Sequence, residues 1–322
     1  MGKKVLLSIP DYSSFYPGIH RAFKYMGFEV ANFDYRKFNA SEKLMTISGR
    51  KKAAYESLNH RLCSFASAWR PDIFLTIKGE TVFHDTIKML KKNGAKTVNW
   101  FPDYVNAFEL ALRLSSYYDY FFHFDPLSVS KLKKAGRKNV YYLPFAADIL
   151  PDDKKLQVKE KKYEVSFIGN YDNYRAEYLK SIGDLGLNIW GDSRWAKSVL
   201  SHCYRGTLAN FKFAGISRAS KININIQHEY SCEGLVLRPF EVLGASAFLL
   251  TERCKDVDRL FKDNVATFGS PEELRNKIIY FLTHDKERDK LSNRGYSAVK
   301  IRNTYLNRIR RILSYNPSTK YG

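Results

Sequence analysis

Short apolar runs alternate with polar loops and with amphipathic stretches along most of the chain. The run at 3–9 predicts an opening strand, a helix is expected from about 19 to 26, and the next strand is expected within 28–34. A strand, a helix and a second strand in this order are typical of a parallel, doubly wound sheet. The same pattern predicts further helices at 50–68 and 82–93 and further strands within 70–80, 96–104, 118–125 and 135–148.

The pattern is interrupted at 151–162, where the sequence PDDKKLQVKEKK is charged and poor in apolar residues. Such a composition predicts a linker. A second series of strands and helices follows it, and the chain ends in a stretch, 285–313, that reads as one basic helix. We therefore expect an α/β protein with two Rossmann-like domains and an active site in the cleft between them. The expected parts are a first domain at 1–150, the linker at 151–162, a second domain at 163–300 and a C-terminal helix and tail at 301–322.

The most informative stretch is 222–251, which reads ININIQHEYSCEGLVLRPFEVLGASAFLLT. Its alternation of isoleucine with asparagine or glutamine predicts a strand, which is followed by a polar loop, a short helix and a second, apolar strand. Pro239 suits the first turn of that helix and Gly244 suits its end. Glu233 in the loop and Glu241, expected in the first turn of the helix, lie eight residues apart.

A helix start presents N–H groups without helical partners and the positive end of a dipole, and both favour a diphosphate. Glu241 beside such a start is suited to accept hydrogen bonds from ribose hydroxyls, as acidic residues do in other nucleotide-binding folds. Arg238 is suited to bind a phosphate through two hydrogen bonds. Glu233, Gly234 and Leu235 would then face the group beyond the phosphates. These five residues form the centre of a predicted donor site, and Glu233 is also a catalytic candidate.

Loops after other strands of the second half supply further candidates for the donor site. Arg175 follows a glycine-containing loop at a helix start, where a phosphate contact and a solvated position fit the pattern equally. Trp190 and Asn223 fit a donor cleft, and they also fit core packing and hydrogen bonds to neighbouring backbone. The remaining donor-side candidates are small or backbone groups in the same loops: Gly169, Asn170 and Gly191.

An acceptor hydroxyl needs a group that orients it or removes its proton, and the loops of the first half carry suitable side chains. Asp103, which follows the sequence VNWFP, is the first candidate for a catalytic base, and His20, near the expected start of the first helix, is the second. Lys78 and Asp11 are acceptor-side candidates. Each of the four also has a structural interpretation, as a helix cap or an ordinary loop residue.

The composition limits the possible partners and cofactors. Of the 322 residues, 44% are hydrophobic, which suits a globular protein, and the net charge of +20 indicates an anionic partner. Four cysteines without C-x-x-C spacing argue against a zinc site. The D-x-D letters at 256–258 fall on a predicted helical turn, where we expect surface positions, so no metal is expected. No run resembles a leader or a membrane span. This predicts a cytoplasmic protein, with peripheral contact at the inner face of an anionic membrane as an option.

The successive blocks of the chain resemble one known family. EGLVLRPFE has the E-x7-E spacing of the donor motif in GT-B glycosyltransferases, and RPFEVLGASAFLLT is similar to the CgeB-like, spore-maturation branch of the group 1 glycosyltransferases. DIFLTIKG, VNWFPDY, YDYFFHFD, NVYYLPFAAD and YEVSFIGNYDNYR resemble the preceding blocks of that branch, in the same order. The resemblance extends over about 70–313.

The resemblance implies a GT-B fold, with an N-terminal acceptor domain, a C-terminal nucleotide-sugar domain and a last helix that crosses back to the first domain. It implies sugar transfer from a nucleotide sugar, such as a UDP-sugar, without a cofactor. Retention of configuration is favoured, because E-x7-E is commonest among retaining enzymes. The acceptor is open: a glycan, a glycolipid or a protein. One alternative is a basic protein that binds nucleic acid or an anionic surface, although no nucleic-acid motif is present and no nucleic acid is expected. The other is a sugar-nucleotide epimerase, which also has two Rossmann domains.

Overall fold

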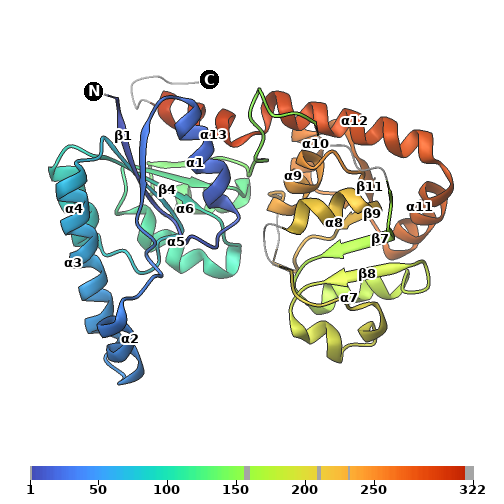
Figure 1. The fold of residues 1–322 in the computed structure, drawn as a ribbon, viewed down its shortest axis with the longest axis horizontal. Helices are drawn as coiled ribbons and strands as arrows, with labels where there is room; N and C mark the ends of the chain where they lie inside the picture. The colour runs from blue at the N-terminus through green and yellow to red at the C-terminus, as the bar shows by residue number, and fades with distance from the viewer. Residues whose placement is uncertain (1, 156–159, 209–211, 231–232, 316–322) are drawn as a thin grey trace. The chain divides into compact units, whose positions relative to one another are not determined.

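The chain forms two compact units, Met1–Pro144 and Phe145–Gly322. The computed structural model describes residues 2–155, 160–208, 212–230 and 233–315 (Figure 1). Each unit contains one parallel sheet and its own set of helices. The predicted linker at 151–162 belongs to the second unit, and its residues 156–159 lie outside the described part of the chain.

Unit 1 is built on a six-stranded sheet in the order β2-β1-β3-β4-β5-β6, with every neighbouring pair parallel. From β1 the chain adds β2 on one side and β3 to β6 on the other, so the sheet is doubly wound. The carboxyl ends of all its strands therefore lie at one edge. The strands are β1 (Lys4–Ser8), β2 (Glu29–Asn32), β3 (Ile73–Ile77), β4 (Lys96–Phe101), β5 (Tyr120–His123) and β6 (Val140–Tyr142).

The sheet of unit 1 is covered by helices, which explains why its strands read as apolar runs rather than alternating ones. All five residues of β3 are buried. Phe74 of this strand belongs to a core cluster with Leu58 and Ile87, which lie on two of the helices. The helices are α1 (Phe15–Tyr25), α2 (Ala40–Ile47), α3 (Lys51–Trp69), α4 (His84–Lys92), α5 (Phe108–Ser115) and α6 (Pro126–Lys134), with a short 3-10 turn, η1 (Val105–Ala107).

Three helices of unit 1 differ from the prediction, and one of them is α5, for which no helix was expected. The first begins at Phe15, four residues before the expected start, so that His20 lies in its second turn and not near its beginning. The second, α2, was not predicted at all. It begins with a capping box in which the Asn39 side chain accepts the backbone N–H of Glu42 and the Glu42 side chain accepts that of Asn39. This signal is legible in the sequence.

The last residue of β5, His123, makes the stability of the protein depend on pH. Burial lowers the pKa of His123 from 6.5 to about 4, although the charge of Asp125 acts in the opposite direction. Its Nδ1 accepts the backbone N–H of Asp125 at 3.0 Å, so the neutral ring carries its proton on Nε2. Because the unfolded chain binds this proton more readily, stability is full above about pH 6.5 and falls as the pH drops toward 4.

We expect the free energy of unfolding to fall by about 2 kcal/mol more in the wild-type protein than in His123→Gln between about pH 7.5 and pH 5. Glutamine keeps a hydrogen-bond acceptor but does not titrate, so the other ionisable groups cancel in the comparison. Urea unfolding at the two pH values measures the difference. Equal losses in the two proteins would show that His123 does not titrate in this way.

Unit 2 is built on a five-stranded parallel sheet in the order β11-β10-β9-β7-β8. Its strands are β7 (Tyr163–Ile168), β8 (Leu187–Trp190), β9 (Ser220–Asn225), β10 (Leu249–Glu252) and β11 (Ala266–Phe268). Its helices are α7 (Asn173–Lys180), α8 (Phe213–Ala219), α9 (Leu237–Gly244), α10 (Lys255–Leu260), α11 (Pro271–Thr283), α12 (Asp285–Arg302) and α13 (Tyr305–Ser314), with 3-10 turns at Ser193–Lys197, Ser201–Cys203 and Lys262–Asn264.

The expected single helix at 285–313 is two helices. The chain leaves α12 at Asn303, and α13 begins with a capping box between Thr304 and Asn307. The break is held by a short parallel bridge, in which the N–H of Ala147 donates to the carbonyl of Asn303 at 2.9 Å and the N–H of Tyr305 donates to Ala147 at 3.1 Å. That the last helix crosses to the first domain stays a prediction.

Candidate functional site

The loops after β7 and β8 approach each other so closely that only glycine fits. The N–H of Gly169 donates to the carbonyl of Trp190 at 2.9 Å, and the carbonyl of Gly169 accepts from the indole of Trp195 at 2.9 Å. A Cβ at Gly191 would lie 2.1 Å from the carbonyl oxygen of Gly169. These two glycines therefore shape the ends of two neighbouring strands, where ligands of such sheets bind.

We expect Gly191→Ala to lower the free energy of unfolding by about 3 kcal/mol, because the added methyl group meets backbone that cannot rotate away. Gly215→Ala is the matched control. Gly215 lies inside α8 with open space around its Cα, so alanine there should be neutral or stabilising by up to about 1 kcal/mol. Urea unfolding of both variants checks the prediction, and equal stabilities would contradict the close approach.

Arg175, on the first turn of α7, is buried and ties two strand ends together. Its Nη1 donates to the carbonyl of Asn170 at 3.0 Å, and its Nε lies 3.2 and 3.3 Å from the carbonyls of Ile226 and Gln227. The side chain is also 3.4 Å from the carboxylate of Asp172, the N-cap of the helix. A solvated surface position is therefore wrong for this arginine, because it holds the loops after β7 and β9 in register.

The helix α9 brings Arg238 and Glu241 together. Nη1 of Arg238 donates to Oε2 of Glu241 at 2.5 Å, and its Nε donates at 3.3 Å to the carbonyl of Ile168, the last residue of β7. The guanidinium also lies 3.9 Å from the ring centre of Phe213. Arg238 is therefore fixed above the end of β7. Glu241 lies in the second turn of the helix, one turn later than predicted, since α9 begins at Leu237.

The environment of Glu241 favours its protonated form more than water does. Burial raises the pKa of Glu241, and the charge and hydrogen bond of Arg238 only partly offset this. Burial, and then the charges of Glu241 and Asp148, also raise the pKa of Tyr305 well above its usual range. The Tyr305 side chain at the start of α13 is thus part of the surroundings of Glu241. The N-cap of α9, Val236, makes no side-chain capping hydrogen bond, and the first turn of the helix contains no acidic residue.

The second glutamate, Glu233, belongs to a loop that is anchored on α10. Its carboxylate pairs with Lys255, and its carbonyl accepts the N–H of Asp256 at 3.2 Å. Asp256 in turn accepts the N–H of Leu235 at 3.2 Å and pairs with Arg259 at 2.7 Å. The expectation that 256–258 is a surface D-x-D was wrong at Asp256, which is fully buried because it caps this loop.

The structure brings Gly169, Asn170, Gly191, Arg175, Arg238 and Glu241 to neighbouring strand ends of unit 2, and it ties the Glu233 loop to the same edge. Gln227, which follows β9, connects the Glu233 loop to this edge, because its Nε2 donates to the carbonyl of Gly234 at 3.1 Å. Asn223 and Trp190 have structural roles instead. Asn223 donates to the carbonyls of Ser217 and Phe248 at 2.9 and 3.2 Å, and Trp190 packs edge to face on Tyr163.

In unit 1, the structure pairs two of the acceptor-side candidates. Nζ of Lys78 lies 2.6 Å from Oδ2 of Asp103, so the loops after β3 and β4 meet at the carboxyl edge of the sheet. Lys78 adopts a left-handed backbone conformation, with φ 63°, which non-glycine residues rarely adopt. Such conformations gather at functional sites, where the surrounding structure maintains them. The pair presents an ammonium and a carboxylate that a polar ligand can bind.

The other two candidates lie apart from this pair. His20 faces Tyr16 on α1, and burial, followed by the charge of Lys24, lowers the pKa of His20. Asp11, after β1, accepts a hydrogen bond from the Asn32 side chain at 2.9 Å and forms a weaker ion pair with Lys37 at 3.8 Å. Asp11 therefore belongs to a different part of the same sheet edge.

Several residues around the site were missed by sequence reasoning. Lys255, Asp256 and Gln227 all act through the 233–235 loop, and Tyr305 adjoins Glu241 from a helix more than sixty residues away. Their partners are distant in the sequence, so no local pattern indicates them. Arg36 is another case, since its guanidinium bonds to Glu80 and to the hydroxyl of Tyr12.

Solved structures of the same fold cover nearly the whole chain. A sucrose-phosphate synthase from Thermosynechococcus elongatus is similar with a TM-score of 0.67 and 10% identity, over 97% of this chain and 98% of its own. Anabaena HepE in complex with UDP-glucose is similar with a TM-score of 0.63 and 11% identity, over 97% of this chain and 99% of its own. The chain has the GT-B fold. A putative UDP-N-acetylglucosamine 2-epimerase from Listeria monocytogenes shows a weaker similarity, with a TM-score of 0.55 and 12% identity, over 98% of this chain and 96% of its own.

The family comparison agrees with the predicted GT-B fold. Residues 175–314 match the family described as "Glycosyl transferase-like". The match contains both glutamates of the E-x7-E motif and the Arg238–Glu241 pair. No curated protein matches the sequence. The GT-B fold and the family match together support a glycosyltransferase of the group 1 type.

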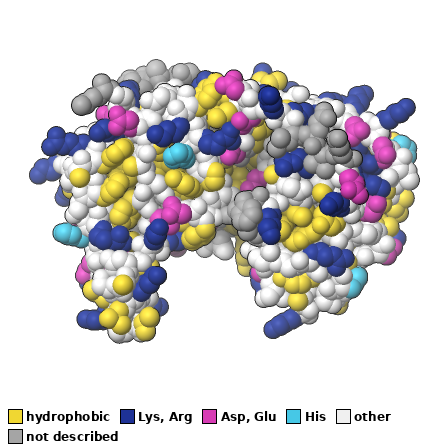
Figure 2. All heavy atoms as spheres, viewed as in Figure 1, with side chains coloured by type: hydrophobic (Ala, Val, Ile, Leu, Met, Phe, Trp, Pro, Cys, Tyr) yellow, Lys and Arg dark blue, Asp and Glu magenta, His cyan; other side chains and the backbone are white. Residues whose placement is uncertain are grey.

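The net charge does not concentrate on the face drawn in Figure 2. Lysine and arginine side chains are scattered over that face and are interspersed with acidic ones. The described lysine and arginine side chains on this face therefore form no single continuous cationic patch. None of the helices in the described part of the chain combines the length and the apolarity that a membrane crossing requires.

Proposed function

We propose that the protein is a glycosyltransferase that moves a sugar from a nucleotide-sugar donor, held by residues of unit 2, to an acceptor hydroxyl, held by residues of unit 1. The observation that carries the proposal is the Arg238–Glu241 pair, which is fixed above the end of β7 beside a helix start without a side-chain cap. A guanidinium, helix N–H groups and a carboxylate are the groups that bind a nucleoside diphosphate.

Each residue then has a role in the transfer. The Arg238 guanidinium and the first N–H groups of α9 stabilise the charge that grows on the leaving diphosphate. The carboxylate of Glu241 accepts hydrogen bonds from the ribose, and Glu233 faces the transferred sugar with the backbone of Gly234 and Leu235. In unit 1, Asp103 accepts a hydrogen bond from the acceptor hydroxyl while Lys78 holds the carboxylate in place.

The finer points of the proposal rest on the resemblance and on the comparisons. UDP is the first nucleotide to test, because HepE has been solved with UDP-glucose and with UDP and glucose. We propose retention of configuration and a metal-independent reaction, since Arg238 and the helix start supply positive charge at the diphosphate. We also propose the CgeB-like branch as the closer family, and 1–150 and 163–300 as the acceptor and donor domains.

Thermal unfolding with UDP-, GDP-, dTDP- and CMP-sugars tests the donor assignment directly. We expect UDP-sugars to raise the Tm by several degrees, because a ligand that binds only the folded state stabilises it. The other three classes should give smaller shifts. If none of the four classes raises the Tm and the protein binds nucleic acid in a salt-sensitive way, it is a nucleic-acid-binding protein and this proposal is wrong.

A sugar-nucleotide epimerase is the second candidate, because a putative UDP-N-acetylglucosamine 2-epimerase has the same overall fold. An epimerase would turn over UDP-N-acetylglucosamine without any acceptor. Incubation with this sugar nucleotide alone, followed by chromatography, distinguishes the two. An altered sugar formed without an acceptor would favour the epimerase.

A further inference from the structure

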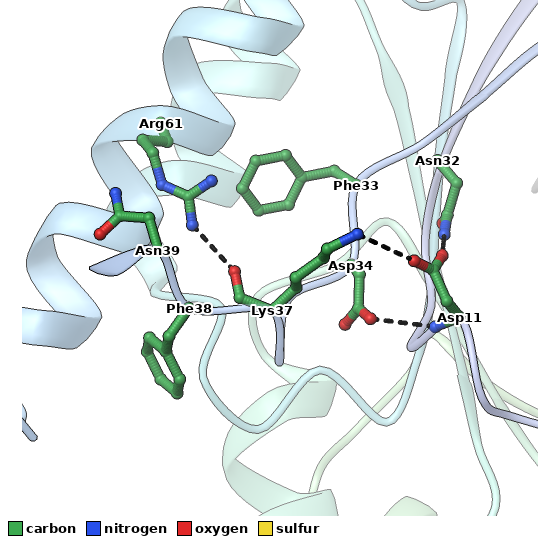
Figure 3. Close-up of a pocket in the computed structure, with 8 residues that line it drawn as sticks. All are labelled: Asp11, Asn32, Phe33, Asp34, Lys37, Phe38, Asn39 and Arg61. Atoms are coloured by element: carbon green, nitrogen blue, oxygen red, sulfur yellow. Dashed lines mark hydrogen bonds and ion pairs between the residues drawn. The ribbon is translucent and has the colours of Figure 1, made fainter. Parts of the chain in front are cut away.

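A small cavity in unit 1 lies at the carboxyl ends of β1 and β2 (Figure 3). Its volume is about 310 Å³, which is at the lower end of the range for small-ligand sites. Such a cavity holds one ring-sized group and is too small for a nucleotide sugar. Its walls come from the ends of the two strands, from the loops that follow them and from α3. The residues that line it include Asp11, Asn32, Phe33, Asp34, Lys37 and Arg61.

Two carboxylates are held in fixed positions at the floor of this cavity. Asp34 accepts the N–H of Arg36 at 2.8 Å and the N–H of Asp11 at 3.0 Å, one on each oxygen. Asp11 accepts from the amide of Asn32 at 2.9 Å, and Figure 3 shows the three side chains converging. Because a carboxylate oxygen can accept more than one hydrogen bond, both carboxylates retain capacity for a donor from a ligand.

The cations around the cavity are already neutralised. Arg61 donates from Nε and Nη2 to the carboxylate of Glu42, at 2.8 Å each. Burial alone would raise the pKa of Glu42, but the hydrogen bonds from Arg61, Asn39 and Ser57 lower it, so this carboxylate stays ionised. Lys37 extends toward Asp11, with Nζ 3.8 Å from Oδ2. In the described part of the chain, Asp34 has no ion pair, so the charged lining residues together with Glu42, the partner of Arg61, carry one more negative than positive charge.

This balance indicates which ligands fit. Fixed acceptor oxygens favour a ligand with several hydrogen-bond donors, and the excess negative charge disfavours phosphate or carboxylate groups. Phe33 and Phe38 add apolar surface to the lining of the cavity, which suits the C–H groups of a sugar ring. An uncharged, hydroxyl-rich ring meets all of these conditions.

The position of the cavity relates it to the Lys78–Asp103 pair. The strand order β2-β1-β3-β4 places the cavity two strand positions from that pair, or about 10 Å along the same edge. Arg36 connects the two places, because it positions Asp34 through its N–H and reaches Glu80, two residues after Lys78, through its guanidinium.

We propose that this cavity is a subsite for an uncharged saccharide ring of the acceptor, held by Asp34 and Asp11 about 10 Å from the hydroxyl that reacts at Asp103. The inference rests on the proposed function and names the acceptor class: a saccharide whose ring at this subsite carries no phosphate. An acceptor of this kind spans both places, so remote binding helps to orient the reacting end.

Saturation-transfer NMR with methyl glucoside, methyl galactoside and methyl mannoside tests the subsite, with the 6-phosphates of the same sugars as charged probes. We expect at least one neutral glycoside to bind the wild-type protein more tightly than its phosphate. Asp34→Asn should weaken that binding about tenfold, because it removes a charged hydrogen-bond acceptor while keeping the shape. Phe38→Ala, which removes the apolar wall, should weaken it as well.

Asp72→Asn is the matched control. Asp72 also accepts a backbone N–H, from Lys4 at 2.6 Å, and lines a cavity of about 510 Å³ at the amino edge of the same sheet. Its substitution should leave glycoside binding unchanged. Tighter binding of the phosphates, glycoside binding that neither Asp34→Asn nor Phe38→Ala alters, or no binding of any neutral glycoside would overturn the subsite.

UDP-glucose binding, measured on the same samples, separates this inference from the proposed function. If the protein binds UDP-glucose but none of the glycosides, the inference about the acceptor is wrong and the proposed transferase activity still stands. If glycosides bind through Asp34 but no sugar nucleotide binds, the cavity is a saccharide site and the proposed transferase activity is wrong.

Discussion

Replacing Asp103 with alanine is expected to slow sugar transfer about a hundredfold while leaving the affinity for the donor unchanged. The carboxylate lies 2.6 Å from the Lys78 ammonium at the carboxyl ends of β3 and β4, in the unit that we propose to hold the acceptor. Its loss removes a charged acceptor for the reacting hydroxyl. Release of the nucleoside diphosphate in the presence of an acceptor measures the rate, and calorimetry with UDP-glucose measures the donor affinity.

The size of this loss also bears on the stereochemistry. A hydrogen bond to a charged group accounts for about 10- to 150-fold, whereas a general base contributes up to about ten-thousandfold. A loss well above a thousandfold would identify Asp103 as a base and contradict the retaining form of the proposal. Glu56→Ala is the control, because Glu56 is an exposed carboxylate on α3 that pairs with Lys52. An unchanged rate in Asp103→Ala would remove this residue from the mechanism.

The second large effect is expected at Glu241. Glu241→Ala should raise the Kd for UDP-glucose about a hundredfold, because it removes the acceptor for two ribose hydroxyls and the partner that positions Arg238. Glu241→Gln should cost less, since it keeps one acceptor oxygen. Calorimetry on the wild-type protein and both variants measures the three affinities.

A matched glutamate in the same unit provides the control for Glu241. Glu177 on α7 pairs with Lys180 at 2.5 Å, with the same i,i+3 spacing as Arg238 and Glu241, but its side chain is exposed. Glu177→Ala should bind UDP-glucose as the wild-type protein does. Equal affinities for Glu241→Ala and Glu177→Ala would place the donor elsewhere.

Much of the fold could be predicted, because strands that are buried under helices appear in the sequence as runs of apolar residues. The five buried residues of β3 and the alternation in β9 are both legible without any tertiary information. The helix α2 was missed although its capping box is local, because the segment lacks a clear apolar stripe: only Glu42 of its eight residues is buried. The break between α12 and α13 could not be foreseen from helix propensity, since a hydrogen bond from Ala147 helps to set it.

The candidate site was predicted only where its contacts are local. Arg238 and Glu241 are three residues apart on one helix, so their pairing follows from the helix itself. For Arg175 the sequence left a phosphate contact and a solvated position equally open, and its bonds to the carbonyls of Ile226 and Gln227, about fifty residues later, could not be foreseen. The same holds for the contact of Gly191 with Gly169, which depends on how two adjacent strands end.

The bridge between Ala147 and the start of α13 has a consequence for shortened forms of the protein. The guanidinium group of Arg308, late in the chain, makes two hydrogen bonds to the same segment: its Nε and Nη2 donate to the carbonyl of Phe145 at 3.1 and 2.9 Å. Residues at the start of unit 2, Phe145 and Ala147, are thus held in place by residues near the end of the described chain. A chain that ends before Thr304 should therefore lose stability as a core mutant does, although only C-terminal residues are removed. In natural relatives, changes at the two places are expected to be inherited together.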